Sequence, residues 1–341
     1  MKKQKLAIIS NEKTYQNKSN YFCDNVDMKS IPEGLKKDFH IELFVRKSKK
    51  IRSAHKINIK NIIISSGIFS YIYKVFKSSN ANNKYLIISL SPYTFMMSIL
   101  LFILGKKVFI YLRSDGYEEY RNFSKYFGPL FYHFMFSLAC LKSQLIACRS
   151  KLLKGKKGKI VSPSQLNKKW FKKRKAPKFK KIKLLYVGRL RIEKGIFSLI
   201  EIVKKLKLNF KFTIVNSEKL NSNKLKNEQI KIVQFNKNHE SLINIYDDSN
   251  IFILPSFTEA HPQVLDESLS RLRPVIIFPE ISHVRRNREG VFVVKRNAQS
   301  LSNKINFILK RYKSIQKKML KNKLPTKNLF TKQLKNIIID A

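Results

Sequence analysis

The chain has 341 residues, of which 43% are hydrophobic, and this excludes a disordered chain and indicates two cores of ordinary size. Seventy Lys and Arg against 22 Asp and Glu give a net charge of +48, which should attract phosphorylated substrates, anionic lipids or nucleic acid. The bias of an A/T-rich genome toward Lys, Asn and Ile is the alternative explanation of this charge. The cysteines Cys23, Cys140 and Cys148 form no C-x-x-C pair, so a disulfide framework or zinc site is not expected and a reducing cytoplasm is favoured.

The first 165 residues alternate between strand-like and helix-like segments. Apolar runs predict strands at residues 5–10, 40–45, 59–65, 84–90, 107–112 and 144–148. Helical patterns lie between some of these strands, at residues 68–77, 94–104 and 129–141. Continuous apolar strands are typical of a parallel sheet that is covered on both faces, so residues 1–165 are predicted to form a Rossmann-like domain. The segment SNEKTYQNKSNYF, residues 10–22, is predicted as a loop after the first strand.

Two apolar stretches of this half invite a targeting or membrane interpretation. The stretch at residues 86–104 has nearly the length of a membrane span, but Ser89, Ser91 and Pro92 divide it into a buried strand and a helix. The apolar run at the N-terminus is shorter than the core of a signal peptide. Both stretches are therefore predicted to be buried parts of the first domain.

The second half repeats the alternation after a basic linker, which is predicted at residues 166–180. Strands are predicted at residues 182–187, 211–216, 230–235, 250–255, 274–278 and 291–294. Helices are predicted at residues 194–206, 239–247, 262–271 and 298–312. These segments predict a second Rossmann-like domain at residues 181–325, and residues 326–341 are predicted to form a helix that packs back on the first domain. The predicted fold class is α/β, with two doubly wound parallel sheets that face a cleft.

The segment LLYVGRLRIEKG, residues 184–195, carries the first candidate site residues. Gly188 follows a strand and lets the backbone approach a ligand closely. The guanidinium of Arg189 can grip phosphate oxygens, and Lys194 adds a positive charge where a helix begins. This arrangement suits a diphosphate leaving group, whose negative charge must be neutralised. The alternative is a helix cap with solvated basic residues.

The segment IFILPSFTEAHPQVLDES, residues 251–268, carries two acids at the end of a buried strand. Glu259 lies in a loop, where it can accept hydrogen bonds from sugar hydroxyls, and Glu267 lies in the following helix, where it can take both hydroxyls of a ribose. The backbone amides from His261 to Val264 begin that helix and can bind phosphate. The alternative is that Glu259 is a turn residue and Glu267 lies on the surface.

A third segment, RPVIIFPE at residues 273–280, adds a short buried strand. In this order and spacing the three segments resemble the retaining GT-B glycosyltransferases of family GT4, the glycosyl transferases group 1. The resemblance covers residues 181–310, on Val187-Gly188-Arg189, Lys194-Gly195, Leu254-Pro255-Ser256, the pair Glu259/Glu267, and Pro274-Val275-Ile276. It is faint in the N-terminal half.

The resemblance implies sugar transfer from a nucleoside diphosphate sugar, with retention at the anomeric carbon, no cofactor and no obligatory metal; the sequence has no D-x-D motif. It implies that Arg189 and Lys194 neutralise the diphosphate, that Glu259 contacts the donor sugar and that Glu267 contacts the ribose. The residues expected to bind the donor are Gly188, Arg189, Lys194, Glu259, Ala260, His261, Pro262, Gln263, Val264 and Glu267.

The sequence departs from the family pattern in places. Arg273 stands where a glycine usually precedes the Pro-Val-Ile strand. In the N-terminal half, the loop after the first strand contains no glycine, and the histidine that the family has after a strand of this half is absent. At the matching strand end lie Arg113, Ser114 and Asp115, which are predicted to orient the acceptor or its attacking hydroxyl, with Asp115 as a catalytic residue. The alternative is that Asp115 and Gly116 only form a turn.

The sequence predicts an enzyme of cell-envelope polysaccharide or lipopolysaccharide synthesis, with a glycan or lipid-linked acceptor. Aromatic and Lys residues mix at 70–77 and 123–138, which suits a cytoplasmic protein that docks on the anionic inner leaflet of the membrane. The alternative is a well-packed core with an ordinary basic surface. A basic nucleic-acid-binding protein and an inactive scaffold of the same fold are the alternatives. No nucleic-acid-binding motif is present, so no nucleic acid partner is expected.

Overall fold

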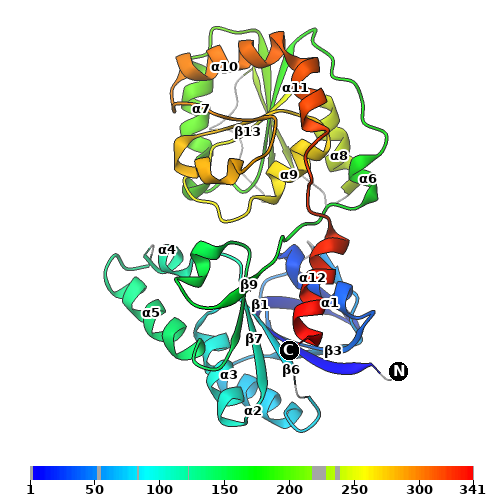
Figure 1. Ribbon diagram of the computed structural model, residues 1–341, viewed down its shortest axis with the longest axis vertical. Helices are drawn as coiled ribbons and strands as arrows, with labels where there is room; N and C mark the ends of the chain where they lie inside the picture. The colour runs from blue at the N-terminus through cyan, green and yellow to red at the C-terminus, as the bar shows by residue number, and fades with distance from the viewer. Residues whose placement is uncertain are drawn as a thin grey trace. The chain divides into compact units, whose positions relative to one another are not determined.

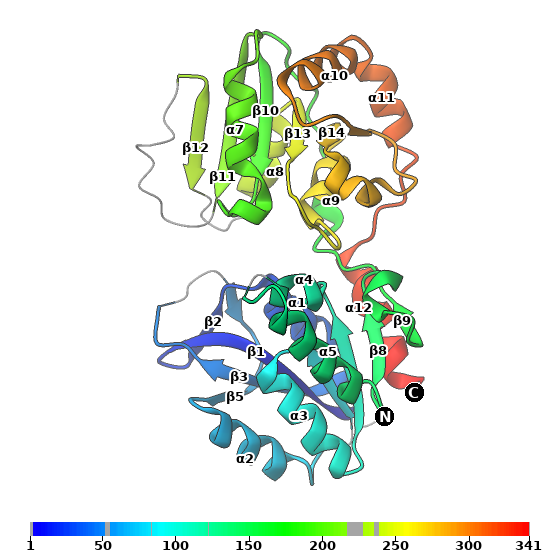
Figure 2. The same ribbon diagram turned by 90° about the vertical axis from the view of Figure 1, so that its left-hand side faces the viewer.

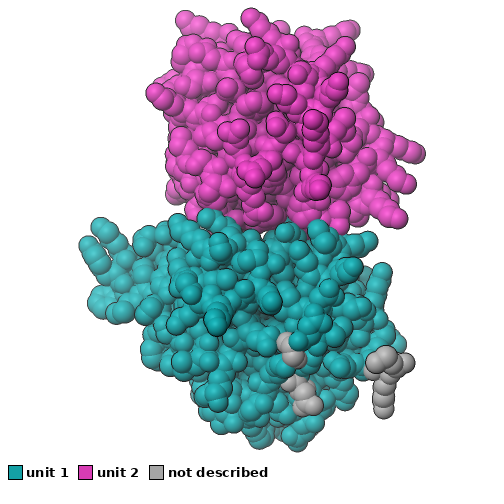
Figure 3. Space-filling view, viewed as in Figure 1, with its two compact units in different colours: residues 1–163, 327–341 teal, residues 164–326 magenta. Residues whose placement is uncertain are grey.

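The computed structural model describes residues 3–51, 55–82, 84–121, 123–216, 228–234 and 239–340. The chain divides into two compact units, and Figure 3 colours them separately. Unit 1 contains residues 1–163 and 327–341, and unit 2 contains residues 164–326. Each unit has a mainly parallel sheet with helices on both faces (Figure 1), so the predicted α/β class with two parallel sheets is confirmed. The stretch 166–180, predicted as a linker, lies within unit 2.

The sheet of unit 1 is parallel through its centre, in the order β5, β3, β1, β6, β7, β8, β9. Its strands are β1 (Gln4–Asn17), β2 (Asn20–Cys23), β3 (Phe39–Lys47), β4 (His55–Ile57), β5 (Asn61–Ser65), β6 (Lys84–Ile88), β7 (Lys107–Leu112), β8 (Gln144–Ala147) and β9 (Gly158–Ile160). Its helices are α1 (Val26–Leu35), α2 (Ile68–Ser78), α3 (Pro92–Ile103), α4 (Gly116–Arg121), α5 (Phe127–Ala139) and α12 (Lys327–Ile339), with a 3₁₀ turn at Ser150–Leu153. Helix α3 packs between α2 and α5, whereas α1 packs against α12 (Figure 1).

The predicted loop at residues 10–22 is wrong. Strand β1 continues to Asn17, turns at Lys18 in the left-handed region (φ 51°), and pairs antiparallel with β2. The prediction failed because this segment is polar, whereas its backbone still finds partners on two sides. After a register shift β1 pairs with β3 as far as Thr14, whose side chain is buried, and β2 pairs in turn with β4.

The sheet of unit 2 has six parallel strands in the order β12, β11, β10, β13, β14, β15. The strands are β10 (Ile182–Val187), β11 (Phe210–Asn216), β12 (Ile230–Gln234), β13 (Ile251–Leu254), β14 (Val275–Ile277) and β15 (Val291–Val293). The helices are α6 (Lys168–Phe171), α7 (Ile196–Lys204), α8 (His239–Asp248), α9 (Gln263–Ser270), α10 (Ala298–Lys310) and α11 (Tyr312–Met319), with 3₁₀ segments at Ile192–Lys194 and Pro279–Arg285. Residue 235, the predicted end of β12, lies outside the described residues.

The order of these strands fixes where a ligand can bind. From β10 the chain crosses to β11 on one side, whereas from β13 it continues to β14 on the other side. The neighbours β10 and β13 therefore form the topological switch point, and in such sheets ligands bind beyond the carboxyl ends of the strands at this place. Figure 1 shows α7 and α10 on one face of this sheet and α8 and α9 on the other.

Two arginines, Arg271 and Arg273, are fully buried in unit 2. The Nε and Nη2 atoms of Arg271 donate to the Asp247 carboxylate at 2.9 and 2.7 Å, and Nη2 of Arg273 lies 3.9 Å from the same carboxylate. Buried cations need such partners because the interior cannot hydrate them. Asp247 thus holds two cations in place.

The remaining guanidinium N–H groups of Arg271 and Arg273 bind backbone carbonyls in the first residues of unit 2. Arg271 donates to the carbonyls of Trp170, Lys172 and Lys173 at 2.8 to 3.0 Å, and Arg273 donates to the carbonyl of Lys175 at 2.8 Å. A basic segment that was predicted as a linker is therefore fixed against α8 and α9 through its backbone carbonyls. The side chains of Arg174 and Lys175 add hydrogen bonds to the Ser270 carbonyl at 2.8 Å and to Asn244 at 3.2 Å.

Replacement of Asp247 with Asn should destabilise unit 2, because it leaves two buried guanidiniums without their carboxylate. The expected loss is about 3–5 kcal/mol in the free energy of unfolding, measured by urea denaturation. Asp248→Asn is the matched control: the Asp248 side chain is 73% exposed and pairs with Lys183, so a change within about 1 kcal/mol is expected. Equal stability of the two variants would contradict the structural role of Asp247.

Candidate functional site

The loop after β10 brings the first predicted residues to the switch point of unit 2. Gly188 follows the strand directly, and a Cβ there would lie 2.6 Å from the Tyr186 hydroxyl. That hydroxyl donates to the carbonyl of Arg189 at 2.7 Å, which shapes the loop and leaves the Arg189 side chain exposed. Lys194 ends the following 3₁₀ turn, immediately before α7.

The loop after β13 places Glu259 against Lys194. The Lys194 Nζ lies 2.6 Å from Oε1 of Glu259, and the Ser256 hydroxyl donates to the same oxygen at 2.8 Å. Only 24% of the Lys194 side chain and 12% of the Glu259 side chain are exposed, so the two charges attract each other more strongly than they would in water. The structure therefore brings together two residues that lie 65 positions apart in the sequence.

Gly195 makes this approach of the two loops feasible. Its φ of +64° lies in the left-handed region, and a Cβ there would lie 2.0 Å from the carbonyl oxygen of Pro255. Arg296 holds the same carbonyl with a hydrogen bond of 2.9 Å from Nη2, while its Nε donates to Glu280 at 2.8 Å. The loops after β10, β13 and β15 are therefore joined through one carbonyl group.

Glu267 lies within α9 and is not a surface residue. The Tyr246 hydroxyl donates to its Oε2 at 3.0 Å and also to the carbonyl of Val264 at 3.2 Å. Burial raises the pKa of Glu267 from 4.5 to about 7, against the opposing effect of the Tyr246 hydrogen bond. Near neutral pH this carboxyl is thus divided between its acid and its carboxylate.

His261 joins a cluster that the sequence analysis missed. Its Nε2 lies 3.2 Å from Oδ2 of Asp266, Arg288 forms an ion pair with the other oxygen of Asp266, and Nη2 of Arg286 lies 3.3 Å from Nδ1 of His261. The side chains of His261 and Asp266 are 3% and 2% exposed. The sequence signal for this cluster was Asp266, an acid directly before Glu267 in a chain with few acids.

The other predicted donor residues lie between Glu259 and α9. Ala260 is partly exposed, and Pro262 caps α9 without donating an N–H group. The helix therefore begins with the amides of Gln263 and Val264, which have no acceptor within the helix. Within the described ranges, no three His, Cys, Asp or Glu side chains gather as ligands of one metal ion.

In unit 1 the predicted acceptor-side residues follow β7, and two of them are held by ion pairs. The Nε of Arg113 lies 2.8 Å from the Asp27 carboxylate. Asp115 lies 3.0 Å from Nζ of Lys154, and its other oxygen accepts from the amide of Tyr117 at 3.1 Å, so it also caps the short helix α4. Ser114, between them, is partly exposed.

The switch point of unit 1 lies between β1 and β6, one strand away from these residues. Here Arg46 donates to Asn11 at 2.9 Å and lies 3.8 Å above the ring of Tyr93. These side chains were not predicted as site residues, because residues 10–22 were predicted to form a loop, whereas Asn11 lies in strand β1.

Comparisons with known proteins identify a family domain in unit 2. Residues 167–323 match the family model described as glycosyl transferases group 1. The match includes Arg189, Lys194, Glu259 and Glu267. Among curated proteins, no sequence matches the chain significantly.

Solved structures resemble the whole chain at low sequence identity. HepE of Anabaena, in complex with UDP and glucose, matches with a TM-score of 0.73 and 12% identity over 99% of this chain and 100% of HepE. Sucrose-phosphate synthase of Thermosynechococcus elongatus matches with a TM-score of 0.67 and 15% identity over 98% and 95% of the two chains. WaaG, a glycosyltransferase involved in lipopolysaccharide biosynthesis, matches with a TM-score of 0.66 and 13% identity over 98% and 100%. The chain therefore contains a glycosyl transferases group 1 domain of family GT4, and its fold is that of the GT-B glycosyltransferases.

Proposed function

We propose that the protein is a retaining glycosyltransferase that moves a sugar from a nucleoside diphosphate sugar to a hydroxyl group. The observation that carries this proposal is the Lys194–Glu259 pair at the switch point of unit 2. A cation for the diphosphate and an acid for the sugar hydroxyls meet there, beside the first amides of α9. The complex of HepE with UDP and glucose supports a nucleotide sugar as the donor.

In this proposal the diphosphate binds to Lys194, to the exposed guanidinium of Arg189 and to the amides of Gln263 and Val264. Glu259 accepts hydrogen bonds from the donor sugar, and Glu267 accepts them from the ribose. Gly188 and Ala260 let the ligand approach the backbone, and the buried ring of His261 holds the loop between Glu259 and Pro262. The protein therefore contributes mainly orientation and fixed charge.

The transfer breaks the bond between the anomeric carbon and the diphosphate oxygen, and the electron pair leaves with the diphosphate. The acceptor hydroxyl oxygen forms the new bond to the anomeric carbon, and its proton passes to the departing diphosphate. Lys194 and Arg189 stabilise the negative charge that develops on the leaving group.

On the acceptor side we propose Ser114 and Asp115 as the residues that orient the attacking hydroxyl, with Arg113 holding their loop through Asp27. The acceptor is a glycan or a lipid-linked saccharide of cell-envelope polysaccharide or lipopolysaccharide synthesis. The low-identity likeness to WaaG supports this setting. The charge of +48 supports a cytoplasmic protein that docks on an anionic membrane surface.

Replacement of Lys194 or Arg189 with Ala should lower turnover by roughly 10²–10³-fold, because the developing charge on the diphosphate loses a fixed cation. Glu259→Ala should lower transfer more than nucleotide binding. Binding is measured by thermal shift against a panel of UDP- and GDP-sugars, and turnover is measured as release of the nucleoside diphosphate from the sugar nucleotide that binds.

Lys204→Ala and Glu201→Ala are the matched controls. These residues form an exposed pair of 2.9 Å on α7 of the same unit, so their variants should keep full activity. Near-normal turnover in both Lys194→Ala and Arg189→Ala would refute the assignment of the diphosphate site. Nucleotide-sugar binding without turnover in the wild type would indicate an inactive scaffold, and DNA retention without nucleotide-sugar binding would indicate a nucleic-acid-binding protein.

Nucleotide-sugar affinity should rise with pH, because only the ionised form of Glu267 accepts hydrogen bonds at both oxygens. With a pKa of about 7 for this carboxyl, the affinity should increase by up to roughly tenfold between about pH 6 and pH 8. Glu267→Gln should abolish this dependence, whereas Glu201→Gln should keep it.

The raised pKa of Glu267 also makes the stability of the folded chain depend on pH, and this stability changes in the opposite direction to the affinity. A carboxyl with a raised pKa stabilises the folded chain below its ordinary value of 4.5, and this contribution is lost as the pH rises through about 7. The Gln variant should therefore become more stable than the wild type only at the higher pH. For the affinity, a wild-type value that does not change between about pH 6 and pH 8 would contradict the assignment of Glu267 to the ribose.

A further inference from the structure

Helix α5 has apolar side chains on both of its faces. One stripe, which includes Tyr132, Met135 and Phe136, is buried, and the rings of Tyr132 and Phe136 pack against Tyr117 of α4. The opposite stripe consists of Phe127, Leu130, Phe131 and Phe134, which are 77, 66, 47 and 55% exposed. Spacings of three, four and seven residues place these four side chains on one face of the helix. We call this stripe the α5 ridge.

The neighbouring helices extend the apolar surface. Figure 2 shows α2, α3 and α5 side by side on one face of the unit 1 sheet. On α2, Phe69, Tyr73 and Phe76 are 84, 61 and 52% exposed, and on α3 Ile103 is 73% exposed. Single exposed apolar residues are common on proteins, but three adjacent helices with outward aromatic side chains form a surface that needs a partner.

The three helices carry no negative charge, and on the neighbouring helix α4 the acid Glu118 forms an ion pair with Arg121 at 2.8 Å. The helices α2, α3 and α5 contain no Asp or Glu, and the sequence has none between Glu119 and Glu193. Exposed lysines flank the α5 ridge at both ends. The Nζ of Lys125 lies 5.4 Å from the ring centre of Tyr126, and that of Lys142 lies 5.1 Å from the ring centre of Phe102 on α3.

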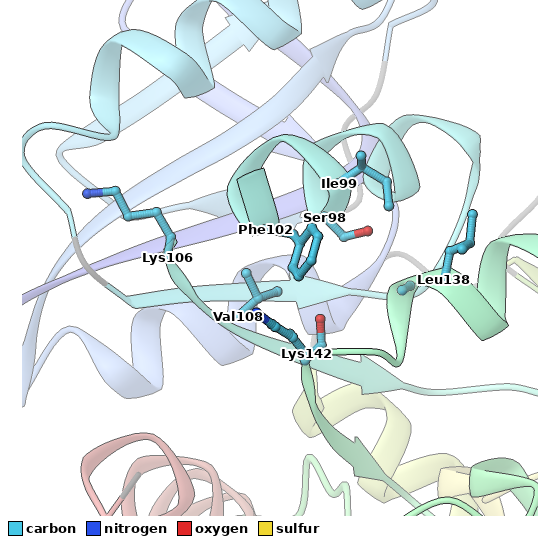
Figure 4. A pocket seen from close by; sticks show the side chains of 9 residues that line it. Ser98, Ile99, Phe102, Lys106, Val108, Leu138 and Lys142 are labelled. Atoms are coloured by element: carbon cyan, nitrogen blue, oxygen red, sulfur yellow. The ribbon is translucent and has the colours of Figure 1, made fainter. Parts of the chain in front are cut away.

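A shallow hollow, partly open to solvent, lies at the C-terminal end of the ridge. Figure 4 shows that Ser98 and Phe102 of α3, Leu138 of α5 and Lys142 surround it. Its lining mixes apolar side chains with two lysines, Lys106 and Lys142, and with the hydroxyls of Ser98 and Ser143. A lysine beside apolar side chains is suited to the boundary between phosphate headgroups and acyl chains.

We infer that the α5 ridge is a membrane-docking surface, which inserts its aromatic and aliphatic side chains between anionic phospholipids while Lys125 and Lys142 bind their phosphates. In the described part of the chain no helix combines the length and apolarity needed to cross a bilayer. Charge complementarity identifies the occupant. A nucleic acid would require cations along the whole face, and a second copy of the chain would bring its lysines against those of the first. The inference rests on the proposed function only for its setting at a membrane.

The test is flotation with vesicles of phosphatidylcholine alone or of phosphatidylcholine mixed with phosphatidylglycerol, without donor or acceptor. The wild-type chain should float with the anionic vesicles and stay behind with the neutral ones. Lys125→Ser and Lys142→Ser should each weaken binding about fivefold. The double variant Phe127→Ser/Leu130→Ser should weaken it by about tenfold or more, and because both side chains are exposed the fold should survive.

The matched control removes one apolar side chain and two lysines from an exposed part of unit 2, as Leu320→Ser with Lys317→Ser and Lys318→Ser. This control should float like the wild type. The variant Phe127→Trp gives a second readout, because the only native tryptophan, Trp170, is buried. The emission of the new indole should shift to the blue on anionic vesicles, whereas that of the variant Leu320→Trp should not respond.

Three outcomes would overturn the inference: no flotation of the wild type with anionic vesicles, equal flotation of the Phe127→Ser/Leu130→Ser variant, or a loss of flotation in the unit 2 control. Retention on DNA that the ridge variants abolish, without flotation, would assign the surface to nucleic acid instead. Vesicle binding is measured without sugar transfer, so a failure of the proposed activity leaves this result intact.

Discussion

The candidate donor site depends on the close contact between Gly195 and the carbonyl of Pro255. A methyl group at residue 195 would overlap this carbonyl, because its Cβ would lie 2.0 Å from the oxygen. Lys194 directly precedes this glycine, and Glu259 follows Pro255 by four residues, so the contact fixes the separation between the cation and the carboxylate. The electrostatics of the site are therefore set first by backbone packing, and the charges act from positions that the loops already hold.

Acids are scarce in this chain, and three of those in unit 2 hold cations at or near the site. Asp247 neutralises a buried arginine pair, Asp266 lies between His261 and Arg288, and Glu259 lies against Lys194. A chain with 70 basic residues can bury only those cations that receive a carboxylate or several carbonyls, because an unpaired charge is costly in the interior. Many of the remaining cations stay exposed, and the helices α2, α3 and α5 contain no acid.

The fold was predictable from the sequence where one pattern decides the structure. Continuous apolar runs located all six strands of unit 2 to within a residue or two, since a parallel strand buried on both faces has no other composition. Lys194 and Glu259 were predictable as members of one site because both follow neighbouring strands at their carboxyl ends.

Other features depended on contacts that the sequence does not display. The polar extension of β1 is a strand because β3 and β2 offer backbone partners. Arg271 can be buried because the carbonyls of Trp170, Lys172 and Lys173, which are distant in sequence, accept hydrogen bonds from it. His261 was expected to contribute its backbone, whereas its side chain forms a cluster with Asp266 that only the fold brings together.

Helix α12 has a consequence for how the protein is made. It belongs to unit 1 although unit 2 separates it from the rest of that unit by more than 160 residues of sequence. Its Lys335 pairs with Asp38 at 2.6 Å, and Phe330, Leu334 and Ile338 complete the core beneath α1. During synthesis on the ribosome, unit 2 is available to fold before the last segment of unit 1 emerges. Until α12 is made, part of the core of unit 1 therefore stays uncovered. This apolar surface is accessible to chaperones until α12 packs on it.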